Sequence, residues 1–271
     1  MVELAGEDAL SMMSTEVLAR SSRVRSAASC RNLLLRALPL ESLERLWPQL
    51  ESVPLQPKRV LHYPQTPMKH LYFPEEGLVS IVAHAGEGKS IEGWLVGREG
   101  FIGIPILLGE DVPSHRRVVQ IGGSALRIRA DAMQQAMEDM RPVRDLFLYY
   151  VHVVLMQTAQ LSACNAAHSV QQRVARWLLM AQDHSGKDAL PLTHDILARM
   201  LGIRRATVTD CIISLERSGM LEKARSLIQI VDRDRLKEAA CPCYGMIRVA
   251  EKRLLGRCGK HSAGPSQSKL A

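Results

Sequence analysis

The segment LARMLGIRRATVTDCI, residues 197–212, constrains the fold more than any other stretch of this chain. Gly202 follows an apolar-periodic run, where a helix can end in a left-handed conformation that is inexpensive only for glycine. Ala198, four residues earlier, is small enough to let a second helix cross closely. Val208, six residues later, falls on the buried side of that second helix. The spacing predicts a helix-turn-helix.

The ends of the two predicted helices indicate a use for this motif. Thr193 is placed to cap the first helix, with Asp195 in its first turn. The second helix begins with Arg204 and Arg205, although arginines at a helix N-terminus oppose the helix dipole. A phosphate or a base edge in the major groove of DNA would offset that cost. We interpret the motif as a DNA reader; the alternative is an ordinary helix pair whose arginines are solvated.

Residues 221–240, LEKARSLIQIVDRDRLKEAA, predict a two-stranded ribbon around 224–226 and a terminal helix. Such a ribbon is similar to the wing of a winged helix, although it can also simply cap the helical bundle. The residues expected at DNA are the exposed start of the second helix, the cap of the first and the tip of the ribbon: Arg204, Arg205, Thr207, Thr209, Asp210, Thr193, Lys223 and Arg225.

The positive charge of the chain is concentrated in its C-terminal part. The formal net charge is +7, and residues 241–271 carry six Lys/Arg against one Asp/Glu. Residues 165–240 carry twelve Lys/Arg against nine Asp/Glu, whereas residues 40–164 are net negative. This distribution favours a polyanionic partner. A solvated basic tail without a function would give the same count.

Residues 55–130 consist of short β-branched or aromatic runs separated by proline and glycine, which predict an antiparallel roll or sandwich. Helical patterns precede this region at 32–53 and follow it at 131–140 and from Pro142 to about Asn165. The first half of the last helix is apolar on nearly every face, so it must be covered on all sides. It lies either between two domains of one chain or between two copies in a homodimer.

The expected organisation is an α+β chain with an N-terminal antiparallel β-roll, a long dimerisation helix and a C-terminal winged helix-turn-helix. We place a flexible arm at 1–31, the β-roll sensor at 32–130 and the interdomain helix at 131–166. The winged helix-turn-helix follows at 167–240, and a basic tail at 241–271.

This order of parts resembles the Crp/Fnr family of bacterial transcription regulators over about residues 33–240, most clearly in LTHDILARMLGIRRATVTDCIISLERSGML at 192–221. The resemblance implies a homodimer that binds palindromic operators and senses a signal through the β-roll. It also implies that Arg205 reads guanine and that Thr207 belongs to the same reading helix. Ala206 stands where the family has a base-contacting glutamate, and Asp210 where it has a second arginine. The usual operator is therefore not expected.

The β-roll departs further from the cyclic-nucleotide-binding members of that family. The segments REGFIGIPILLG at 98–109 and SHRRVVQI at 114–121 lack the acid after the glycine and the small hydroxyl and alanine after the arginine. Arg116 and Arg117 remain as candidates for holding an anionic effector, but cyclic AMP is not expected. The iron–sulfur branch needs closely spaced N-terminal cysteines, and only Cys30 lies there. Scattered His62, His70 and His84 have no haem-specific spacing.

The Cys-Pro-Cys segment at 241–243 leaves several possibilities open. The pair can bind metal or form a redox link with Cys258, but the sequence shows no second pair as a zinc site requires. We expect reduced cysteines with no special role, no metal and no cofactor. A cupin-like enzyme would need clustered histidines, and no His-x-His, P-loop or Gly-x-Ser-x-Gly occurs in the sequence. We expect no enzymatic activity.

The location and partners follow from the same reading. The N-terminus carries acids where a signal peptide is basic, and the longest apolar run, FLYYVHVVLM at 147–156, is too short to span a bilayer. The expectation is a cytoplasmic regulator without membrane contact. Its partners would be double-stranded DNA, a second copy of the chain and, for an activator, RNA polymerase. The alternative function is a ligand-binding regulatory subunit that controls a partner protein without touching DNA.

Overall fold

The computed structural model describes residues 26–84, 86, 90–224 and 226–256. Most of the arm expected at 1–31 lies outside these residues. The part that is described is packed, because Cys30 is 4% exposed and the Arg31 backbone N–H donates to Glu75 Oε1 at 3.0 Å. The boundary of the arm at residue 31 is therefore wrong, since residues 30–31 already belong to the β-roll domain.

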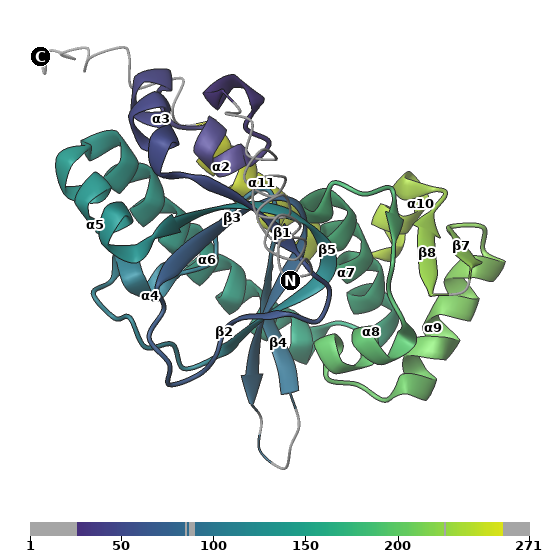
Figure 1. The fold of residues 1–271 in the computed structure, drawn as a ribbon. Helices are drawn as coiled ribbons and strands as arrows, with labels where there is room; N and C mark the ends of the chain where they lie inside the picture. Colours follow the sequence, from purple (N-terminus) through teal and green to yellow (C-terminus); the bar gives the residue numbers. More distant parts are fainter. Residues whose placement is uncertain (1–25, 85, 87–89, 225, 257–271) are drawn as a thin grey trace, which may run out of the picture.

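The N-terminal domain is built on one curled antiparallel sheet (Figure 1). Its strands are β1 (Glu51–Leu55), β2 (Val60–His62), β3 (His70–His84), β4 (Ser90–Val96) and β5 (Arg116–Arg129). The order is β1-β5-β3-β4, with β2 also pairing with β5. Register shifts between Pro74 and Val79 interrupt the β3–β5 pairing, and such bulges bend strands. These two long strands therefore curve into a roll, as the predicted fold class requires.

Helices cover one side of this roll: η1 (Ala27–Ser29), α2 (Leu33–Arg36), α3 (Leu40–Leu46), η2 (Trp47–Gln49), α4 (Ile104–Leu107), α5 (Ala130–Asp139) and α6 (Arg141–Ala167). The helical prediction for 32–53 runs too far, because β1 begins at Glu51. Phe73 of β3, Phe101 and Phe147 of α6 fix the docking of α6, with ring centroids 5.0–5.8 Å apart.

The long helix α6 matches the prediction for 142–165 closely. It has 27 residues and a mean hydropathy of 1.2 over its most apolar window, so by length and composition alone it resembles a membrane span. The helix reaches this length because it includes polar and charged residues beside the ten-residue apolar run at 147–156. Eight of its side chains are nevertheless buried in the protein, from Val143 to Cys164, as in the core helix of a folded domain.

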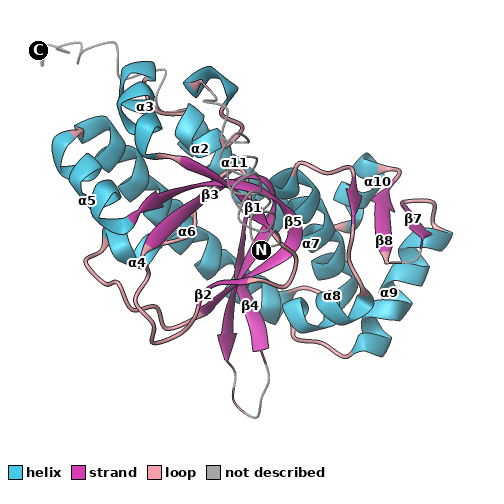
Figure 2. Cartoon of the chain, in the orientation of Figure 1, coloured by secondary structure: helices cyan, strands magenta, loops and turns pink. Residues whose placement is uncertain are grey.

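The C-terminal domain contains α7 (Val170–Ser185), β6 (Ala189–Leu190), α8 (His194–Leu201), α9 (Arg205–Arg217), β7 (Leu221–Ala224), β8 (Leu227–Ile230) and α10 (Arg233–Ala239). The three strands form a small antiparallel sheet in the order β6-β8-β7 beside the helices (Figure 2). The predicted ribbon is the β7–β8 hairpin.

Part of the segment predicted as a basic tail is instead a helix, α11 (Cys243–Leu255), which packs against α6 and α7. Ile247 and Leu254 are 3% and 0% exposed and lie two turns apart on the inner face of α11. Lys252 and Arg253 are exposed on the other faces of α11, and residues 257–271 of the predicted tail lie outside the described residues.

The two domains share a continuous hydrophobic core. Leu78, Leu95 and Ile121 of the roll belong to the same buried cluster as α7, α8 and α9. Figure 1 shows α7 and α8 lying directly beside the roll. The position of the helix-turn-helix is thus fixed by packing against the β-roll.

Candidate nucleic-acid interface

The helix-turn-helix has the steric features that the sequence predicts. Gly202 ends α8 in the left-handed conformation, with φ 65° and ψ 35°. Ala198 is 7% exposed and Val208 is fully buried, so both lie in the contact between α8 and α9. The Thr193 hydroxyl accepts a hydrogen bond from the Ile196 backbone N–H at 3.3 Å and caps α8.

The N-terminal turn of α9 carries two exposed arginines. Arg204 is the N-cap residue and Arg205 the first helical residue. Arg205 Nε lies 3.3 Å from Asp195 Oδ1, and both side chains are more than half exposed. Because an exposed ion pair of this kind contributes little stability, its guanidinium can exchange this partner for a base edge at low cost.

The three other candidate residues on α9 differ in their exposure and in their hydrogen bonds. Asp210 is exposed, and Thr207 is half-buried. The Thr209 hydroxyl donates to the Arg205 carbonyl at 3.0 Å and lies 2.8 Å from Nδ1 of His194 in α8. Thr209 thus connects the two helices, which makes its hydroxyl less available to DNA than the sequence suggests.

His194 was missed by the sequence analysis because a lone histidine in the first turn of a helix gives no signal. Burial, followed by the positive charges of Lys223 and Arg205, lowers its pKa. Lys223 of the wing and Arg205 of α9 thus both contribute positive charge near His194. Lys223 is exposed, whereas Arg225 lies outside the described residues.

The two arginines proposed for the effector lie on opposite faces of β5. Arg116 donates to the Ser90 hydroxyl at 3.2 Å. Arg117 is 4% exposed, donates to the His115 carbonyl, and its Nε has no hydrogen-bond partner among the described residues. Burial lowers the pKa of Arg117 to about 10, and burial likewise lowers the pKa of neighbouring His62 to about 4.

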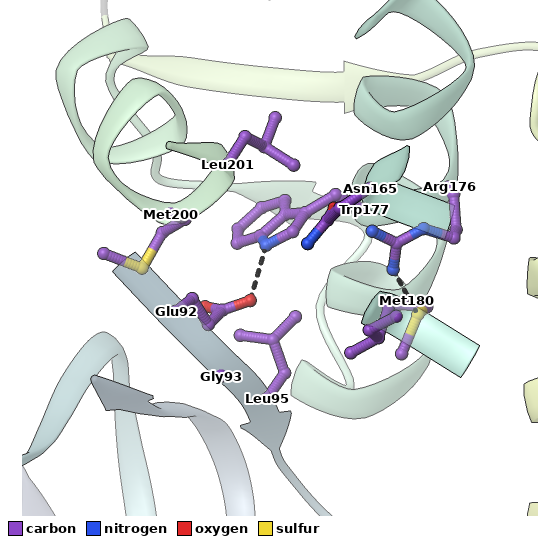
Figure 3. Close-up of a pocket in the computed structure, with 10 residues that line it drawn as sticks. Glu92, Gly93, Leu95, Asn165, Arg176, Trp177, Met180, Met200 and Leu201 are labelled. Atoms are coloured by element: carbon purple, nitrogen blue, oxygen red, sulfur yellow. Dashed lines mark hydrogen bonds between the residues drawn. The ribbon is translucent and has the colours of Figure 1, made fainter. Parts of the chain in front are cut away.

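One polar contact between the domains joins β4 to α7. Trp177 Nε1 donates to Glu92 Oε1 at 2.9 Å across a pocket lined by both domains (Figure 3). The Ser80 hydroxyl donates to the other carboxylate oxygen at 2.5 Å. Burial raises the pKa of Glu92 to about 7, against the opposing effect of these two hydrogen bonds.

A second contact is a buried charged triad. His184 of α7 lies between Glu99 of the roll and Glu251 of α11, with nitrogen–oxygen distances of 3.4 and 2.8 Å. Gly97 permits the approach, because a Cβ there would lie 2.2 Å from the His184 carbonyl oxygen. Burial alone would lower the pKa of His184, but the two carboxylates raise it to about 9.

A β-roll joined by a long helix to a winged helix-turn-helix with an exposed basic reading turn defines a DNA-binding transcription regulator. Residues 172–239 match the family described as the Crp-like helix-turn-helix domain. The transcriptional regulator SdrP of Thermus thermophilus is 29% identical over 198 residues, covering 70% of this chain and 94% of SdrP.

Solved structures agree with this assignment. A CRP/FNR-family transcriptional regulator from Thermus thermophilus is 27% identical, with a TM-score of 0.53 over 70% of this chain and 98% of its own. A putative regulator of that family from Eubacterium rectale has the same fold, at 18% identity and a TM-score of 0.58 over 76% of this chain and 96% of its own. The chain therefore contains a Crp-like helix-turn-helix domain and resembles transcription regulators of the Crp/Fnr family. The alternative of a subunit that never binds DNA is not supported.

Proposed function

We propose that this regulator is a cytoplasmic homodimer that reads a palindromic operator with the N-terminal turn of α9. The observation that carries this proposal is the exposure of Arg204 and Arg205 at the start of α9, where Arg205 makes an exposed ion pair with Asp195. Two such turns, related by a two-fold axis, would enter successive major grooves about 34 Å apart. Thr193, Thr207, Asp210 and the wing residues Lys223 and Arg225 would contact the flanking backbone or bases.

A seam along α6 supports the homodimer. Its exposed residues recur at the seven-residue spacing of a coiled coil: Leu148, His152, Leu155, Ala159, Ser162 and Ala166. Leu155 is 64% exposed and Leu148 39% exposed, beside Met156 at 56%. A second copy of α6 would cover this apolar seam, while the opposite face of the helix stays packed on the roll.

The β-roll would sense an anionic signal through Arg117, with half-buried Arg116 on the opposite face of β5. Arg117 has no carboxylate partner among the described residues; a buried guanidinium in that state is costly, and an anionic ligand would remove that cost. The shared core of roll and winged domain then gives a route by which occupancy of the roll shifts α7 and α9. For an activator, the operator-bound dimer would also contact RNA polymerase.

Arg205→Ala should weaken operator binding by about 1–3 kcal/mol per half-site contact and relax the preference at one base pair of each half-site. The operator is first selected from a random DNA pool, and affinities are then measured by gel shift over a salt series. Arg217→Ala, an exposed arginine in the last turn of the same helix, is the matched control and should leave base preference unchanged. An unaltered footprint and affinity for Arg205→Ala would refute the assignment.

Leu155→Asp should weaken dimerisation by at least about tenfold, because each dimer would bury two uncompensated carboxylates in the seam. Analytical ultracentrifugation measures the dissociation constant directly. Val231→Asp replaces another exposed aliphatic residue, 53% exposed and outside α6, and should leave the dimer intact. Equal dissociation constants for both variants would show that the seam is not the dimer interface.

A further inference from the structure

Four metal-ligating side chains from distant parts of the chain meet where the long helix ends. Cys164 and His168 are one helical turn apart at the end of α6; Cys241 follows α10, and Cys243, beyond Pro242, is the first residue of α11. One ligand atom from each residue can be chosen such that all four lie within 4.8 Å of one another. The sequence analysis had assigned no role to the Cys-Pro-Cys pair because its partners are more than seventy positions away.

Two of the ligand–ligand distances are close to those around one tetrahedrally coordinated ion. Cys164 Sγ and Cys241 Sγ are 3.4 Å apart, and Cys243 Sγ is 3.6 Å from His168 Nδ1. Zinc–sulfur bonds of about 2.3 Å and zinc–nitrogen bonds of about 2.0–2.1 Å place neighbouring ligands of a tetrahedron roughly 3.5–3.8 Å apart. A disulfide would instead need about 2.05 Å between the sulfurs, and the cysteines are free.

Without a cation, hydrogen bonding does not account for three thiols lying together here. Cys164, Cys241 and Cys243 form a buried cluster of their own, with at most 1% exposure each. Each thiol packs as a small hydrophobe and is only a weak hydrogen-bonding group, so contacts among the three sulfurs add little beyond ordinary packing. A bound cation would stabilise the thiolate form of these side chains, since metal ligands of this kind must be deprotonated.

Neighbouring groups suit a coordinated thiolate cluster. Gln160 Nε2 donates to Cys243 Sγ at 3.1 Å, the kind of outer hydrogen bond that orients a metal ligand. A divalent ion with three thiolates and a neutral imidazole carries one negative charge. Arg176 is 4% exposed, its Nε has no hydrogen-bond partner among the described residues, and its charge acts on Cys241. Figure 3 shows its Nη1 directed at Met180 Sδ, a weak acceptor.

We propose that Cys164, His168, Cys241 and Cys243 bind one zinc ion, which ties the link between α10 and α11 to the end of α6. Three thiolates and an imidazole form a recognised structural zinc set and exclude the oxygen-preferring Mg²⁺ and Ca²⁺. An iron–sulfur cluster distributes its thiolates over separate irons, which requires a wider ligand set than this one. The site lies where the DNA-reading domain leaves the helix, and it does not depend on the function proposed above.

Metal analysis of the full-length wild-type protein tests the proposal. After incubation with Zn²⁺ under reducing conditions and gel filtration, the protein should retain one zinc per chain. Substitution by Co²⁺ should give thiolate-to-metal charge-transfer absorption and the visible bands of a tetrahedral ion. Zinc should also protect Cys164, Cys241 and Cys243 from alkylation, as read by peptide mass spectrometry. A folded, reduced protein that retains no zinc, or a Cys164–Cys241 disulfide under these conditions, would overturn the proposal.

Variants assign the ligands. Cys243→Ser and His168→Asn should each lower zinc affinity by more than about a hundredfold, since losing a direct ligand exceeds the 10–100-fold effect of an outer-shell change. Cys211→Ser alters a buried cysteine on α9 outside the cluster and should retain one zinc per chain. Chelation of the wild type should lower its melting temperature, with no effect on Cys243→Ser. Full zinc retention by both ligand variants would mean that the ion is bound elsewhere.

Discussion

His184→Gln is expected to lower the free energy of unfolding by about 3–5 kcal/mol at pH 7, because it removes the cation from a buried charged triad. His184 is 1% exposed, and its two ring nitrogens face Glu99 and Glu251. Glu251 would keep its ion pair with Arg248, whereas Glu99 would lose the cation that faces it. The three elements that meet here would lose the interaction that joins them.

The pH dependence of stability identifies the triad as the cause. The carboxylates raise the pKa of His184 to about 9 in the folded protein, from 6.5 in the unfolded chain. The folded state therefore holds this proton more tightly, so its contribution is complete below pH 6.5 and disappears as the pH rises towards 9. At about 1.4 kcal/mol per pKa unit, the wild type should lose up to about 3 kcal/mol across that window.

Chemical denaturation at several pH values between about 6 and 9.5 measures both effects. The curve for His184→Gln should lie below that of the wild type at pH 7 and run flat where the wild type declines. His84→Gln replaces an exposed histidine on β3 and should follow the wild type throughout. Parallel curves for His184→Gln and the wild type would show that the imidazole is not charged in the folded state.

The parts of the fold that the sequence predicts well are those defined by short-range patterns. Ala198, Gly202 and Val208 lie within eleven positions, and their packing follows from helical geometry and from one left-handed turn. The ribbon and the long helix are likewise defined by residues that are close together in the sequence. Their predicted bounds agree with β7, β8 and α6 to within a few residues.

The contacts between domains are not local, and the sequence could not show them. Glu92 and Trp177 are 85 positions apart, and Cys164 and Cys241 are 77 apart. Helix α11 was missed for another reason. Its buried face consists of Cys243, Ile247, Glu251 and Leu254, so two of the four positions are not aliphatic. A thiol and a carboxylate obscure the helical period because their partners, not their hydropathy, determine that they are buried.

In the candidate site, too, the sequence predicts what depends on neighbouring residues and not what depends on contacts between distant ones. The sequence identifies Arg204 and Arg205 because the helix start is defined locally. It does not show that Thr209 contacts His194 of the other helix, or that Cys241 and Cys243 lie beside Cys164 and His168. Which polar groups remain available to a ligand depends on tertiary contacts, and these follow only from the folded chain.

Trp177→Phe is expected to cost about 1–3 kcal/mol of unfolding free energy, mainly by leaving Glu92 without one of its two hydrogen-bond donors. Trp177 is 2% exposed, and phenylalanine keeps most of its apolar contact between the domains. Trp177→Ala also opens a cavity and should cost about 3–5 kcal/mol. Because burial raises the pKa of Glu92 to about 7, the Trp177→Phe cost should grow above pH 7, where the carboxylate is ionised and needs the indole N–H most.

Trp94 provides a matched control on the same strand as Glu92. Its indole nitrogen is buried and has no hydrogen-bond partner among the described residues, so Trp94→Phe removes no interaction of that kind. Denaturation of both variants at about pH 5.5 and pH 8 should give a pH-dependent loss for Trp177→Phe and a smaller, pH-independent change for Trp94→Phe. Equal losses at both pH values would mean that the aromatic packing, and not the bond to Glu92, holds the reading domain on the roll.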